Sequence, residues 1–133
     1  MRPRGQLILS LAMVLMSAVA AFGQADKFVG EWKTIDDKTN EPAGLVNIYQ
    51  GEDGLYYGKL VDTFGEDKSS VGTMIVRGMK YEDGKLVGGK VYDPDADKIY
   101  YCTIKYDAAK NVLNLRGSLD KKGLLGRTQT WIK

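Results

Sequence analysis

Short stretches of alternating apolar and polar residues follow one another along this chain, and turn-forming residues separate them at intervals of roughly ten residues. Such alternation is typical of β-strands with one buried face, and helical periodicity is nearly absent. Turn signals include the stretch GEDG and the pair Asp83-Gly84. The pattern predicts strands over residues 28–35, 44–50, 55–63, 85–93, 98–106, 111–119 and 124–132, and either a strand or a short helical turn over 73–81.

Seven or eight short strands in up-and-down order predict an all-β fold, either a small antiparallel barrel or an open sandwich. The first and last predicted strands carry Trp32 and Trp131, and pairing these two strands would remove the sheet edges. Glycines inside strands mark the bulges and close backbone approaches that a small barrel needs. Because the chain has such glycines, we expect a barrel of about eight strands; they are Gly58, Gly88, Gly89, Gly117 and Gly126.

The first 25 residues have the pattern of a secretory signal peptide. Arg2 and Arg4 precede an uncharged apolar run over residues 7–22, and small residues follow it. Cleavage after either Gly23 or Ala25 fits the small-residue rule. We therefore expect a cleaved leader over residues 1–25, a single domain over 26–133 and no membrane span in the mature chain, with an uncleaved membrane anchor as the alternative. No cysteine follows the apolar run, so a secreted or periplasmic protein without a lipoprotein anchor is expected.

Composition excludes several classes of function. The chain has 19 basic and 17 acidic residues, and Arg2 and Arg4 in the leader account for the excess, so nothing indicates nucleic-acid binding. No histidine is present, which excludes histidine-based triads and histidine metal ligands. The one cysteine, Cys102, lies in an apolar strand and is expected to be a buried, inert thiol, with an intermolecular bridge or a reactive thiol as the alternatives. No cofactor is implied.

The opening strand contains Gly30-Glu31-Trp32, and the closing strand contains Arg127, four residues before Trp131. This combination resembles the calycin signature of lipocalins and their relatives. The resemblance implies a calycin-like barrel in which Trp32 seals one end and Arg127 lies across its ring. Stacking of a guanidinium on an indole is physically favourable, and Gln129 has side-chain groups that can bind neighbouring backbone.

A second interpretation of the closing strand is functional. Arg127 could face a lumen and receive a ligand carboxylate, as an arginine near the end of fatty-acid-binding proteins does. Alternation gives a candidate lumen face of apolar and tyrosine side chains, and a packed core has the same composition. The candidate lumen residues are Tyr100, Cys102, Tyr106, Leu113 and Leu115, with Leu119 on the same predicted face and Gly117 leaving a gap.

Several sequence blocks, taken together, resemble an uncharacterised bacterial family, domain of unknown function 2147. The blocks occur in order as GEWKTIDDKT, IYQGEDGLYYGKLV, IVRGM, GGKVYDPDADKIYYC, LNLRGS and LLGRTQTW. The resemblance implies a small exported protein, and it brings no established reaction, substrate or partner. Many members carry one or two cysteines in the loop after the third strand, where this chain has FGEDKSSVG, and a glycine where it has Asp97.

Two acidic turns are weak candidates for chemistry. Asp93, Asp95 and Asp97 alternate like the first ligands of a calcium loop, but Lys98 stands where that loop requires glycine, so a simple turn is the main expectation. Paired carboxylates suited to acid–base chemistry would come from Asp36 and Asp37 with Glu41.

We therefore expect a non-enzymatic protein that binds a small apolar or amphipathic ligand such as a carboxylated lipid. One alternative is a module that binds an envelope protein through outward tyrosines while its barrel is filled. A hydrolase that uses only carboxylates is the remaining alternative. The residues expected to bind ligand or close the barrel are Trp32, Arg127, Gln129 and Trp131.

Overall fold

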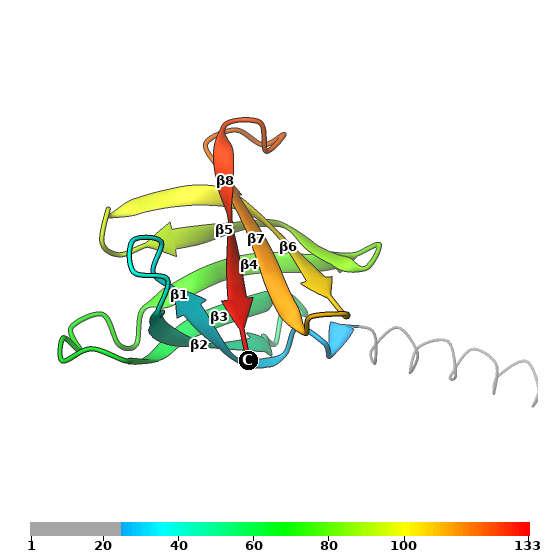
Figure 1. Ribbon diagram of the computed structural model, residues 1–133. Helices are drawn as coiled ribbons and strands as arrows, with labels where there is room; N and C mark the ends of the chain where they lie inside the picture. Colours follow the sequence, from blue (N-terminus) through cyan, green and yellow to red (C-terminus); the bar gives the residue numbers. More distant parts are fainter. Residues whose placement is uncertain (1–24) are drawn as a thin grey trace, which may run out of the picture.

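The computed structural model describes residues 25–133, and there the chain forms a closed antiparallel barrel in which each strand pairs with the next in sequence (Figure 1). The predicted barrel is confirmed, and residues 74–81 of the undecided segment 73–81 belong to a strand. The predicted leader lies outside the described residues except for Ala25. The eight strands are β1 (Gly30–Ile35), β2 (Pro42–Gln50), β3 (Tyr56–Thr63), β4 (Met74–Glu82), β5 (Lys85–Asp93), β6 (Lys98–Asp107), β7 (Val112–Ser118) and β8 (Gly126–Ile132).

The barrel has two different ends. One end, here the tryptophan end, holds the segment before β1, the end of β8 and three short hairpin turns. The other, here the loop end, holds four connections over residues 36–41, 64–73, 94–97 and 119–125, of which all but 94–97 are longer than the turns of the tryptophan end. Within residues 25–133 the register between β1 and β8 contains one pair, Lys33 with Ile132, close to the tryptophan end. The backbone pairing that closes the barrel is therefore short, and it lies near the tryptophan end.

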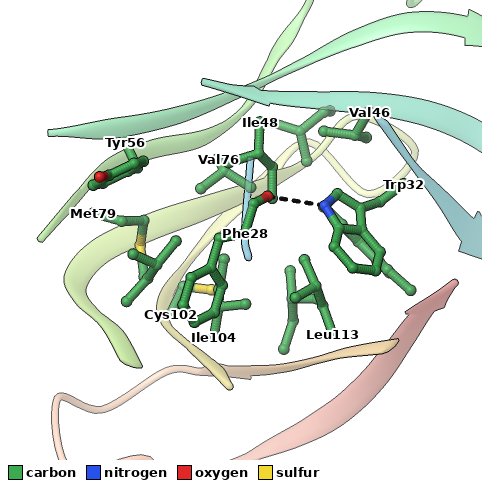
Figure 2. Packing of buried hydrophobic residues seen from close by; sticks show 14 of the residues in the cluster. Phe28, Trp32, Val46, Ile48, Tyr56, Val76, Met79, Cys102, Ile104 and Leu113 are labelled. Atoms are coloured by element: carbon green, nitrogen blue, oxygen red, sulfur yellow. Dashed lines mark hydrogen bonds between the residues drawn. The ribbon is translucent and has the colours of Figure 1, made fainter. Parts of the chain in front are cut away.

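The side chains that face inward form a continuous apolar core (Figure 2). Trp32, Ile48, Met79, Leu86 and Ile104 are fully buried. Alternation along each strand places these residues on one side of the sheet, as the period-two pattern predicts. No helix in the described part of the chain is long and apolar enough to cross a membrane.

The turn between β4 and β5 shows how local sequence sets the strand order. Asp83 and Gly84 have φ angles of 51° and 80°, and they connect two strands that pair directly at Glu82 and Lys85. Two consecutive positive φ angles are typical of the tight hairpin turn that suits the right-handed twist of the strands. The Asp-Gly pair therefore specifies this hairpin, as the sequence predicts.

Gly89 in β5 allows β4 and β5 to approach closely. The register between β5 and β6 shifts between Leu86 and Gly89, which indicates a bulge. A Cβ atom on Gly89 would collide with the sulfur of Met79 and the carbonyl oxygen of Arg77. The close approach brings Met79, which is fully buried, into the core.

Replacing Gly89 by alanine should lower the free energy of unfolding by about 1–3 kcal/mol, because the added methyl group meets backbone that cannot move without disturbing the bulge. Urea unfolding followed by circular dichroism measures the change. Gly65→Ala is the matched control, since a Cβ there would meet no atom within 4 Å. Equal stability of the two variants would contradict the close packing at Gly89.

Candidate functional site

Trp32 and Phe28 seal the tryptophan end. The Trp32 side chain is fully buried, and its indole Nε1 donates a hydrogen bond of 2.9 Å to the carbonyl oxygen of Phe28 (Figure 2). The Phe28 ring meets the rings of Tyr81 and Tyr106 edge-on, each with a centroid distance of 6.3 Å. Phe28 was expected at the start of the first strand, but it lies in a turn before Gly30, where its ring covers the end of the core.

The cation over Trp32 is Lys133 and not Arg127. The Nζ atom of Lys133 lies 4.2 Å from the centre of the Trp32 ring system. Ile132 pairs with Lys33, so the end of β8 lies beside Trp32. Arg127 comes six residues before Lys133, which is about 20 Å along an extended strand. The expected stacking of Arg127 on Trp32 is therefore wrong, although a cation does lie on that ring.

Trp131 and Gln129 occupy the inward face of β8 between the two ends. Trp131 is 2% exposed and pairs with Leu113, while Gln129 is partly exposed and pairs with Leu115. The Trp131 Nε1 donates a long hydrogen bond of 3.4 Å to the Gln129 side-chain oxygen. Solvent therefore begins to reach the inward face at the level of Gln129.

Arg127 lies at the loop end. It pairs with Gly117 in β7, and its side chain is 68% exposed. Its Nη1 atom is 2.7 Å from a carboxylate oxygen of Asp37, in the loop between β1 and β2. This ion pair joins β1 to β8 at the end where their backbones do not pair, and its exposure makes its contribution to stability small.

The residues around Arg127 form an apolar inward surface that solvent reaches. Val91 pairs with Tyr100, Gly117 pairs with Arg127, and a Cβ atom on Gly117 would be 3.6 Å from both Val91 and Tyr100. These distances are ordinary contacts, so a small side chain would fit at the position of Gly117. The residues Val91, Tyr100, Gly117, Gln129 and Arg127 are called the rim site below.

The other candidate lumen residues lie deeper. Cys102, Leu113 and Leu115 are at most 4% exposed and pack in the core. Tyr106 is at the tryptophan end, where its hydroxyl donates a hydrogen bond of 2.8 Å to the Asn111 side chain. Side chains fill the barrel at the depth of Cys102, Leu113 and Leu115, and the residues of the rim site are less buried than these three. Leu119 was expected on the same face, but it lies beyond β7 and is 66% exposed.

Burial determines the chemistry of Cys102. Removal from water raises the pKa of its thiol to about 12, because the thiolate would be formed in apolar surroundings. The thiolate is the reactive form, so at neutral pH this side chain behaves as a small apolar core residue.

The acidic turns are occupied by local hydrogen bonds. The Asp93 carboxylate accepts hydrogen bonds from the backbone N–H groups of Asp95 and Ala96, and Asp97 accepts one from the Tyr92 hydroxyl. Among residues 25–133, no group of three acidic or cysteine side chains is placed to hold a metal ion. This arrangement fits the expected turn.

The other acidic turn is held in the same way. The backbone N–H groups of Lys38 and Thr39 donate to Asp36 and hold the pKa of its carboxyl below the usual range. Asp37 is paired with Arg127. The two carboxylates therefore have separate partners and do not face each other across a cleft.

Sequence reasoning missed two residues of this region. Lys133 follows Trp131 by two residues at the end of β8, so an antiparallel register between the first and last strands would have placed it beside Trp32. Val91 belongs to the rim site because it pairs with Tyr100, and that pairing depends on the bulge at Gly89. No simple pattern in the sequence identifies it.

Trp32→Phe should lower the free energy of unfolding by about 2–4 kcal/mol, because it removes core volume and leaves the Phe28 carbonyl without its donor. Arg127→Ala should change this free energy by less than about 1 kcal/mol, since an exposed ion pair contributes little. Urea unfolding of both variants measures the difference. A loss at Arg127 as large as that at Trp32 would show that Arg127 closes the barrel after all.

The chain is similar to known proteins at two levels. A family model described as "Uncharacterized protein conserved in bacteria (DUF2147)" matches residues 30–133. No curated protein sequence matches the chain significantly. Among solved structures, protein HP1028 from the human pathogen Helicobacter pylori, described as belonging to the lipocalin family, matches with a TM-score of 0.63 and 18% sequence identity. The match covers 80% of this chain and 82% of that chain.

These findings agree with the closed barrel and with the family resemblance described above. The structural similarity at 18% identity shows a lipocalin-like fold, and the family match spans all eight strands. The chain therefore belongs to the family of uncharacterised bacterial proteins DUF2147.

Proposed function

We propose that this protein is a non-enzymatic binder of a small amphipathic molecule with a carboxylate group, and that the rim site holds it. The observation that carries the proposal is the position of Arg127. This exposed guanidinium ends an inward surface whose other members include Val91 and Tyr100. A guanidinium binds a carboxylate with two parallel hydrogen bonds, and an apolar surface beside it suits a hydrocarbon chain.

The packed core limits how the ligand lies. Cys102 and Leu115 are almost fully buried below the rim site, so a chain cannot pass further into the barrel without displacing them. A ligand of moderate length that lies across the rim fits best. Burial of apolar surface contributes roughly 25 cal/mol per Å², and association itself is costly, so micromolar affinity is expected from a shallow site.

The ion pair with Asp37 regulates access to Arg127. A ligand carboxylate must compete with the Asp37 carboxylate, which lies 2.7 Å from the guanidinium. Both side chains are at least half exposed. A ligand carboxylate can therefore replace the Asp37 carboxylate on Arg127 without breaking a buried ion pair. Removal of the Asp37 charge should therefore strengthen ligand binding.

Titration with dansylated undecanoic acid, followed by fluorescence, tests the site. Arg127→Ala should weaken binding about ten-fold, Gly117→Phe should abolish it by filling the space beside Tyr100, and Asp37→Asn should strengthen it. The methyl ester of the probe should be insensitive to Arg127→Ala, because it has no negative charge.

Lys105→Ala is the matched control for charge, since Lys105 is an exposed cation near the tryptophan end of β6. Equal weakening by this variant would mean that Arg127 acts only through net charge. Absence of saturable binding by the wild-type protein, with its fold intact, would refute the proposed function.

Export belongs to the same proposal. The leader pattern over residues 1–25 would bring the protein to the periplasm or the medium, where a carrier meets envelope lipids. Native mass spectrometry of protein exported with its own leader should give a mass without that leader. It should also detect an added mass of a few hundred daltons that is lost in Arg127→Ala. A full-length mass found only in the cytoplasm would contradict export.

A second candidate function is supported by the outer wall of the barrel. Arg77 lies over the Tyr92 ring at 4.8 Å, Lys90 lies over the Tyr101 ring at 5.6 Å, and Ile99 is 51% exposed beside them. Aromatic residues and arginine are enriched in protein interfaces. Recovery of an envelope protein that Tyr101→Ala releases, together with failure of the ligand titration, would favour this function.

A further inference from the structure

The loop between β7 and β8 exposes an unusual amount of apolar surface. Leu119, Leu124 and Leu125 are 66%, 74% and 67% exposed, and all three lie within residues 119–125, here called the leucine loop. Figure 1 shows this loop, in orange, projecting beyond the neighbouring strands. A single exposed leucine is ordinary, but three on one projecting loop indicate a contact surface.

The loop is held in this shape by the Asp120 carboxylate. Its oxygens accept hydrogen bonds from the backbone N–H groups of Leu125, at 2.8 Å, and Leu124, at 3.1 Å. The hydrogen bond from Leu125 in particular lowers the pKa of the Asp120 carboxyl, so it remains charged at neutral pH. The Leu119 N–H donates to the Leu125 carbonyl at 2.9 Å, and the Ser118 hydroxyl donates to the Asp120 carbonyl at 2.6 Å.

Arg116 completes the support from the strand side. Its Nε and Nη2 atoms donate hydrogen bonds of 3.0 and 2.8 Å to the Gly123 carbonyl oxygen. Six polar groups of the loop backbone are therefore satisfied by the loop itself and by β7. This matters because backbone can enter an apolar phase only when its hydrogen bonds are already made.

The exposed charged side chains on the leucine loop itself are basic. Lys121 and Lys122 are exposed on the loop, and Arg127, which is paired with Asp37, lies two residues beyond its end. The one acidic residue of the loop, Asp120, directs its carboxylate to the loop's own amides. Apolar side chains beside exposed lysines are complementary to an anionic bilayer, where lysines meet headgroups and apolar groups reach the acyl boundary.

We propose that the leucine loop docks this protein onto anionic lipid bilayers, with Leu124 and Leu125 entering the headgroup–acyl boundary and Lys121 and Lys122 binding the headgroups. The docking goes beyond ligand binding, because it places the protein at a surface. The loop lies next to Arg127, so a docked barrel presents its rim site to that surface.

Vesicle flotation of the protein purified after export tests the proposal. Wild-type protein should float with vesicles of phosphatidylcholine and phosphatidylglycerol, and much less with phosphatidylcholine alone. Leu124→Ser combined with Leu125→Ser should lower the bound fraction about ten-fold, and Lys121→Gln combined with Lys122→Gln should remove the preference for anionic vesicles. Ile99→Ser is the control for loss of an exposed apolar side chain elsewhere, and it should bind as wild type.

Insertion itself is measured with Leu124→Trp. On anionic vesicles the added indole should shift its emission to shorter wavelength and be quenched by brominated lipids, which a protein–protein contact would not produce. Wild-type protein that remains below the vesicles, or a leucine variant that still floats, would overturn the proposal. So would light scattering that shows a dimer dissociated by the leucine substitutions, because a second copy would then cover the loop.

The two proposals fail separately. The leucine variant should bind dansylated undecanoic acid in solution as well as wild type, because the loop leucines are not part of the rim site. If this variant no longer floats but still binds the probe, the result supports docking by the leucine loop. If it also loses probe binding, the substitutions disturb the barrel, and the proposal that the two surfaces are separate is overturned.

Discussion

The hydrogen bond from the Trp32 indole to the Phe28 carbonyl is the interaction on which the rest of the barrel depends. A sheet that closes on itself needs its first and last strands to meet, and in the described residues they share one backbone pair, Lys33 with Ile132. So short a ladder cannot hold the seam by itself. The buried indole fixes the segment before β1 against the core, and Lys133 covers its ring from β8. Side-chain packing at one end thus does what main-chain hydrogen bonds do elsewhere in the sheet.

Alternation predicts which residues share a face, and that is why the barrel, the Asp83-Gly84 hairpin and the inward face of β6 follow from the sequence. It does not predict depth along the barrel. Arg127 and Trp131 have the same inward parity, yet one is exposed at the loop end and the other lies in the core. Only the antiparallel register shows that Lys133, directly after β8, and not Arg127 is the cation beside Trp32.

The strand glycines illustrate the same limit. As a group they indicate a strongly coiled sheet, but their individual roles depend on neighbours from other strands. At Gly89 a side chain would collide with the Arg77 carbonyl, whereas at Gly117 a small one would fit between Val91 and Tyr100. The first glycine is needed for the close packing of β4 and β5, and the second leaves room for a small side chain. Nothing in either local sequence separates these roles, because the atoms that decide them come from distant positions in the chain.

The uneven closure fits the proposed location of both binding surfaces at the loop end. The backbone pairing of β1 with β8 lies near the tryptophan end, and the loop end carries an exposed ion pair and an exposed apolar loop. Arg127 lies where these features meet, since it pairs with Gly117 in the rim site and lies two residues after the leucine loop. If Lys121 and Lys122 lie on lipid headgroups, Arg127 lies near the same level. A lipid carboxylate could then exchange with Asp37 without first crossing water, so docking would raise the rate of ligand transfer more than its affinity.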